Sequence, residues 1–468
     1  MIFTEFRFIL FFLVAFGVHW SLPVNRMRKV WLLACSYAFY AAWDWRFLSL
    51  IITSTLVDYV VGLALQRSDR PRARAAWLVL SLVVNLGLLG VFKYFNFFIS
   101  SGAELLGFLG IPAEVSVLSI ILPVGISFYT FQTLSYSIDI YQRKLEPCRD
   151  LLDVALFVGF FPQLVAGPIV RAREFLPQLT RRTRFGNIDV KACLVLFLAG
   201  FIKKAVVSDG VAPIVDAYFS DPSSYTAVSA WIGVLLYAVQ IYCDFSGYSD
   251  MAIASAGLLG YSLRENFHFP YLACNLREFW QRWHMSLSTW LRDYLYIPLG
   301  GNRGTRLFTV RNLMITMLLG GLWHGAATQF IVWGAMHGVG LVVHREWSRR
   351  FGRGDRPGTV ARGVGAVITF YWVCLAWIFF RAPDYDSAMT VVRSCVLFDS
   401  PGESALAIEL LGLCAGLAAV HWFVSREFFG EWWKRVPDRA FAVGYGVACA
   451  AVLPFTNPVA EPFIYFQF

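Results

Sequence analysis

Two of the seven histidines in this chain, His284 and His324, lie in the mainly apolar stretch between Leu276 and His337. Imidazole has a pKa of about 6.5, so at neutral pH it can take a proton from a hydroxyl or a phenol. Their spacing of 40 positions is too long for one helix face, and it fits a helix, a loop and a second helix that folds back. We predict that one imidazole activates a nucleophile while the other positions a donor or stabilises developing charge.

The segment around His284 has the spacing of a helix. Trp280, Leu287, Leu291 and Tyr294 form one helical stripe there, at spacings of seven, four and three residues. Charged residues fall between them, namely Arg277, Glu278, Arg282, Arg292 and Asp293. Such a helix cannot face lipid on every side, so we expect it at the membrane interface or along a wet cavity.

His324 lies in the motif Gly-Leu-Trp-His-Gly, where glycines would let a ligand approach the backbone. An imidazole at membrane depth is a functional hypothesis by default. Further candidates for lining a substrate site or tunnel are Trp280, Trp283, Ser288, Trp323, Asp244 and Asp250.

A zinc site is the alternative use of these imidazoles, with His284, His324 and His337 as three ligands. No two of them form His-x-x-x-His and no glutamate lies near His324, so the sequence disfavours a metal. For His337 we expect a role in a buried polar network. The other expected roles are interface anchoring for His19 and His421, beside Trp20 and Trp422, and a loop position for His268.

The composition indicates an all-α polytopic membrane protein. Of the 468 residues, 57% are hydrophobic and only 15% are charged, against about a quarter charged in soluble proteins. The net charge of +9 comes from short basic loops between apolar runs, which is the positive-inside pattern and argues against nucleic-acid binding. The nine cysteines form no Cys-x-x-Cys pair, so we interpret them as small buried hydrophobes.

The apolar runs predict roughly 11 transmembrane helices plus re-entrant or interfacial segments. The basic loops should be cytoplasmic, which places both termini outside, and the N-terminal run should be an uncleaved first span. We expect one domain, comprising N-terminal helices over 1–110, a core over about 118–345, and C-terminal helices and a tail over 360–468. Gln163 and Pro168 lie in a Pro- and Gly-containing stretch that suggests a broken or re-entrant helix.

Three carboxylates fall in apolar sequence, at Asp139, Asp244 and Asp250. Buried carboxylates need partners, and the arginines of the 277–292 helix are available. Buried ion pairs that fix helix packing are the favoured interpretation, with direct chemistry at Asp244 or Asp250 as the alternative.

Five stretches then show a family resemblance: 122–142, 161–171, 241–261, 278–303 and 321–338. Together they resemble the membrane-bound O-acyltransferase (MBOAT) family, in its bacterial alginate O-acetyltransferase-like branch. The resemblance implies helices that enclose a funnel or tunnel, and it implies that His284 and His324 are the two family histidines.

The resemblance also implies a reaction. An acyl group, expected to be acetyl, would move from a cytoplasmic thioester such as acetyl-CoA or a carrier protein toward an extracytoplasmic polysaccharide such as alginate. A tunnel would keep water from the acyl group. The chain would lie in the bacterial inner membrane and work with a periplasmic SGNH-type acetyltransferase. Peptidoglycan O-acetylation and teichoic acid D-alanylation are alternatives; a polysaccharide transporter or flippase, or an export scaffold, would be a different class.

The chain ends in EPFIYFQF, where Phe463, Tyr465 and Phe468 form Phe-x-Tyr-x-x-Phe. This resembles the terminal motif of the small partner protein in teichoic acid D-alanylation. It implies that Tyr465 carries the acyl group on its phenol oxygen after a histidine takes its proton. The alternative is an aromatic tail anchored at the interface.

Overall fold

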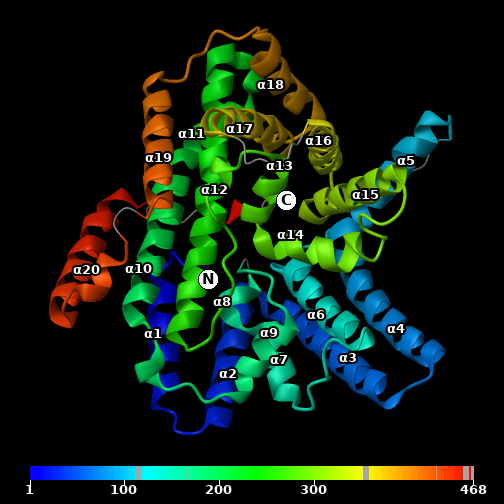
Figure 1. Cartoon of the computed structure of the whole chain (residues 1–468), viewed down its shortest axis with the longest axis vertical. Coiled ribbons are helices and arrows are strands. Elements are labelled where there is room, and N and C mark those ends of the chain that lie inside the picture. Colours follow the sequence, from blue (N-terminus) through cyan, green and yellow to red (C-terminus); the bar gives the residue numbers. More distant parts are fainter. Residues whose placement is uncertain (112–117, 166, 352–357, 428–429, 457–462, 465–468) are drawn as a thin grey trace. The chain divides into compact units, whose positions relative to one another are not determined.

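The computed structural model describes residues 1–111, 118–165, 167–351, 358–427, 430–456 and 463–464 (Figure 1). Every regular element in these ranges is a helix. The predicted all-α class is therefore confirmed.

Within the described ranges, five helical stretches are long and apolar enough to cross a membrane. They are Asn25–Arg67, Pro71–Phe108, Ala227–Leu258, Thr359–Arg381 and Asp438–Phe455. The first contains α2 (Asn25–Asp44) and α3 (Leu48–Arg67), which meet at a short 3-10 turn. Two shorter helices, α1 (Phe6–Ser21) and α19 (Glu409–Ser425), are also apolar. The chain is a multi-pass membrane protein, and the predicted count of about 11 spans is not confirmed.

The chain forms two compact units, which are described separately. The first contains Met1–Cys193 and Ala252–Arg264, and the second contains Leu194–Met251 and Glu265–Phe468. That the chain functions as one domain stays a prediction.

The first unit has a polar centre among apolar helices. Asp58 on α3 is 1% exposed and accepts hydrogen bonds from Ser81 at 2.5 Å and Ser137 at 2.6 Å. Its second oxygen accepts the Asn85 amide at 2.9 Å. These partners come from α4 (Pro71–Leu89) and α6 (Ile126–Tyr141), so one satisfied carboxylate joins three helices.

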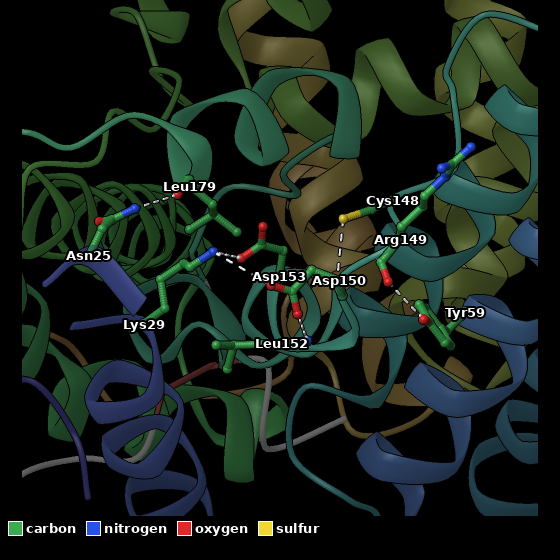
Figure 2. A network of polar contacts seen from close by, with 9 residues as sticks. All are labelled: Asn25, Lys29, Tyr59, Cys148, Arg149, Asp150, Leu152, Asp153 and Leu179. Carbon is green, nitrogen blue, oxygen red and sulfur yellow. Dashed lines mark hydrogen bonds and ion pairs between the residues drawn. The ribbon is translucent and has the colours of Figure 1, made fainter. Parts of the chain in front are cut away.

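A second polar network joins α2 to α7 (Leu151–Gly159), as Figure 2 shows. The ammonium of Lys29 lies 2.5 Å from Asp153 and 4.0 Å from Asp150. The Asp150 side chain also caps α7 by accepting the Leu152 N–H at 3.0 Å. Lys29 and Asp153 are both buried, so each charge depends on the other for compensation.

The predicted break in the helix around Gln163 is confirmed. α7 ends at Gly159, and α8 (Phe161–Leu164) is only four residues long, with Pro162 in its first turn. Proline is tolerated at a helix start but cannot continue a preceding helix, which explains the interruption. The Gln163 amide is buried and donates to the Phe157 carbonyl at 2.5 Å.

In the second unit, α15 (Arg306–His324) packs closely against α16 (Thr328–Phe351). A Cβ added at Gly321 would overlap the carbonyl oxygen of Phe330, and one at Gly334 would overlap that of Met317. A Cβ at Gly325 would overlap the Phe330 ring. The expectation that the glycines beside His324 admit a ligand is therefore wrong, because α16 covers them.

Candidate active site

His284 lies at a break between two short helices, α13 (Leu276–Arg282) and α14 (Met285–Leu291). Its backbone is left-handed, with φ of 40° and ψ of 55°. The prediction of one helix running through His284 is therefore wrong. A non-glycine residue in this region carries strain that its surroundings must offset, and such strain concentrates at functional sites.

Asn266 supplies the contacts that hold this break. Its carbonyl accepts the Met285 N–H at 2.9 Å. Its side-chain oxygen accepts the Ser286 N–H at 3.1 Å and the Ser286 hydroxyl at 2.9 Å. Its amide donates to Ser249 on α12 (Ala227–Leu258) at 3.3 Å. Sequence reasoning missed this residue, and the only signal was an asparagine in the loop that precedes α13.

The His284 imidazole is 1% exposed and is surrounded by aromatic rings. Its ring centroid lies 4.5 Å from that of Phe245 on α12, in an edge contact, and 5.9 Å from that of Trp323. Its two flanking helices have seven residues each, too few to span a membrane. Burial lowers the pKa of His284 to about 3, so its neutral, proton-accepting form prevails at neutral pH.

His324 is the last residue of α15 and is 2% exposed. Its ring centroid lies 4.9 Å from that of Trp333 on α16 and 5.2 Å from that of Phe380 on α17 (Thr359–Arg381). Three helices thus fix the position of this imidazole.

The structure brings the two predicted histidines together, with 6.5 Å between the ring centroids of His284 and His324. A hydrogen bond spans about 2.9 Å, so this separation is compatible with both imidazoles acting on one reacting group. Their catalytic roles stay predictions.

Of the predicted tryptophans, Trp323 contacts both histidines, whereas Trp283 and Trp280 contact other tryptophans of this unit. Trp323 is the penultimate residue of α15, and its ring lies 5.0 Å from that of His324. Trp283 lies 5.0 Å from Trp377, and Trp280 lies 5.7 Å from Trp333. The fourth candidate on this segment, Ser288, donates its hydroxyl to the Trp283 carbonyl at 3.1 Å, which closes the first turn of α14.

The predicted ion pairs of Asp244 and Asp250 are confirmed, but their predicted partners are wrong. Asp244 pairs with Lys204 at 2.6 Å, and Asp250 pairs with Lys203 at 2.5 Å. Both lysines lie in a π-helical segment, η4 (Ile202–Ser208). The nearby arginines have local partners instead, since Arg282 binds Glu278 and Arg292 binds Asp293. Two consecutive lysines in an apolar run were the overlooked signal.

Phe463 and Ile464, near the C-terminus, contact α12, the helix that carries Asp244. The Ile464 N–H donates to Asp244 at 2.9 Å, and the Phe463 ring is fully buried. That ring lies 5.4 Å from Phe245, which itself contacts His284. Tyr465 lies outside the described residues.

Four of the five remaining histidines were given expected roles above, and none of the four belongs to this pair. His337 is fully buried, 4.7 Å from Trp333 and stacked 6.0 Å from Phe279. The surroundings of His337 are thus aromatic where a polar network was expected. His268 is in a loop as predicted, 3.0 Å from Glu265. His19 is buried beside Trp20, and His421 contacts Tyr242. Among the described side chains, no three His, Cys, Asp or Glu residues gather as a metal site requires.

Comparison with known proteins shows similarity to membrane acyltransferases. The model of the MBOAT, membrane-bound O-acyltransferase family matches residues 148–381. The probable alginate O-acetylase AlgI of Azotobacter vinelandii is 45% identical, over 92% of this chain and 86% of that protein. The peptidoglycan O-acetyltransferase of Helicobacter pylori is 38% identical, over 79% of this chain and 73% of that protein. The teichoic acid D-alanyltransferase of Bacillus subtilis is 28% identical, over 56% of this chain and 69% of that protein.

Proposed function

Because this chain belongs to the membrane-bound O-acyltransferase family, we propose that it moves an acetyl group from a cytoplasmic thioester toward an extracytoplasmic polysaccharide of the alginate type. The chain is a membrane O-acyltransferase, which sets aside the transporter and the scaffold. In this proposal it lies in the bacterial inner membrane, with both termini outside.

The observation that carries the proposal is the meeting of His284 and His324, 6.5 Å apart, at a buried position. In the proposed reaction His324 is the general base, and His284 positions the donor carbonyl or stabilises its developing charge. The aromatic rings around both histidines keep water away from the thioester.

The alginate O-acetylase of Azotobacter vinelandii favours acetyl as the group and a polysaccharide as the final acceptor, since it covers 92% of this chain. The Helicobacter pylori relative leaves peptidoglycan as the second acceptor to test. The D-alanyltransferase of Bacillus subtilis covers little more than half of the chain, so D-alanine is the less favoured group.

We further propose that Tyr465 is the acyl carrier. Its phenol oxygen attacks the thioester carbonyl, the new C–O bond forms and the C–S bond breaks. His324 takes the phenol proton and passes it to the departing thiolate. The acetyl ester of Tyr465 then passes to a partner outside the membrane, for which a periplasmic SGNH-type transferase is suited. The contact of neighbouring Phe463 with Phe245, beside His284, supports this role.

The test uses the purified full chain with radiolabelled acetyl-CoA. We expect label on the protein in the wild type, none in His324→Ala and none in Tyr465→Phe. His268→Ala is the matched control, because His268 is an exposed loop residue. Normal polysaccharide acetylation in cells that carry His324→Ala would contradict the proposed function. Full acetylation by Tyr465→Phe would leave the tail as an aromatic anchor.

A further inference from the structure

We propose that Asp244, held in place by Lys204, clamps the C-terminal segment beside His284 and so positions Tyr465. The inference rests on the proposed acyl relay and gives Asp244 a positioning role that is separate from the chemistry.

The carboxylate of Asp244 uses its two oxygens for different partners. Oδ1 lies 2.6 Å from the Lys204 ammonium, and Oδ2 accepts the Ile464 N–H at 2.9 Å. Lys204 also lies 2.7 Å from Asp209, the first residue of α11 (Asp209–Ser220). All four residues are at most 3% exposed.

Each oxygen of Asp244 satisfies a different buried group, the Lys204 ammonium or the Ile464 N–H. A buried N–H costs free energy unless it has an acceptor, and an ionised carboxylate is a stronger acceptor than a neutral oxygen. Lys204 compensates the charge of Asp244 and fixes the orientation of its carboxylate. The second oxygen is thereby aimed at the backbone of the tail.

A ring contact gives the tail a second point of attachment. The Phe463 ring lies 5.0 Å from that of Tyr248 and 5.4 Å from that of Phe245. These two residues are three positions apart on α12, so they form one surface. Phe245 in turn lies 4.5 Å from His284.

The peptide bond between Ile464 and Tyr465 passes this restraint on by one residue. Consecutive Cα atoms are about 3.8 Å apart, so fixing the backbone at Ile464 restricts where Tyr465 can be. A side chain whose backbone is restricted in this way loses less entropy on reaching a reactive geometry.

The competing explanation is that Asp244, Lys204 and Asp209 only stabilise the packing of η4 against α12. Substituting Asp244 alone cannot separate the two explanations, because it disturbs the ion pair as well as the tail. Ile464→Pro can, since proline removes the N–H donor and leaves Asp244 and Lys204 intact. Ile464→Val is its matched control, because valine keeps the N–H.

The experiment is hydrogen exchange, followed by mass spectrometry, of the C-terminal peptide in the purified full chain. We expect the amides after residue 464 to exchange about ten- to a hundred-fold faster in Ile464→Pro than in Ile464→Val, as loss of one charge-assisted hydrogen bond implies. Transfer of radiolabelled acetyl to the protein should fall by a similar factor, with an unchanged thermal midpoint. Asp244→Asn should act in the same direction, whereas Asp216→Asn, which breaks an ion pair with Arg381 elsewhere in this unit, should not.

Equal exchange in Ile464→Pro and Ile464→Val would overturn the clamp. Faster exchange in Ile464→Pro together with full polysaccharide acetylation by Tyr465→Phe would uphold the clamp and overturn the relay. The two failures are therefore distinguishable.

Discussion

The ring centroids of His284 and His324 lie 6.5 Å apart, although the two residues are 40 positions apart in the sequence. If both imidazoles act on one reacting group, their removal must be non-additive. We expect His324→Ala and His284→Ala each to lower the acetyl transfer rate at least about a hundred-fold. The double variant should be hardly slower than His324→Ala alone.

The measurement is the initial rate of transfer from radiolabelled acetyl-CoA, with the thermal midpoint of each variant recorded to establish folding. If the two losses multiply in the double variant, the histidines act independently and the shared site is wrong.

The left-handed backbone of His284, with φ of 40°, leads to a reversal of the usual preference for alanine over glycine. In an ordinary helix glycine is less stable than alanine by about 0.5–1 kcal/mol. A left-handed backbone costs a residue with a Cβ about 1–2 kcal/mol. We therefore expect His284→Gly to unfold at a higher temperature than His284→Ala.

Val339, an exposed residue within α16, is the control position for this comparison. There the alanine variant should be the more stable of the two. If His284→Ala is also more stable than His284→Gly, the break between α13 and α14 carries no backbone strain.

The same residues separate what is predictable from local sequence from what depends on tertiary contacts. Apolar periodicity and family resemblance identified the all-α class and His284 and His324, because those signals are local. The break at His284 was not predictable from the helical spacing, since it depends on Asn266, which lies in a separate loop.

The partners of the buried carboxylates were missed for a similar reason. The arginines of the 277–292 segment were predicted as partners because they are close in sequence to the site. Asp244 and Asp250 instead bind Lys204 and Lys203, some forty residues before them. Only tertiary packing of η4 against α12 creates those pairs. The role of Tyr465 stays a prediction, which came from a terminal motif and from no contact.

The close packing of α15 on α16 makes Gly321 intolerant of any side chain. A Cβ there would overlap the Phe330 carbonyl, which is backbone and cannot turn away. Overpacking of this kind costs about 1–3 kcal/mol, so Gly321→Ala should lower the thermal midpoint. Because Gly321 is one turn before His324, activity should fall as well.

Gly412 on α19 is the matched control, since a Cβ added there meets nothing within 4 Å. Gly412→Ala should leave the midpoint unchanged or raise it, because alanine is the better helix former. Equal midpoints for Gly321→Ala and the wild type would show that the two helices can separate without cost.

Replacing only Lys29 or only Asp153 should lower the free energy of unfolding more than replacing both residues of this buried ion pair. Removing one partner leaves a buried charge uncompensated, which typically costs about 3–5 kcal/mol, whereas replacing both by apolar residues is often neutral. Lys29→Met and Asp153→Leu should therefore each destabilise the first unit strongly, and the double variant should recover most of the loss. The measurement is the thermal midpoint of the full chain in detergent.

Arg143→Ala is the control, because its pair with Asp69 is exposed and such pairs contribute about 0–1 kcal/mol. If the double variant is as unstable as the sum of the single ones, the other groups of this network, Asp150 foremost, depend on Lys29 for more than charge compensation.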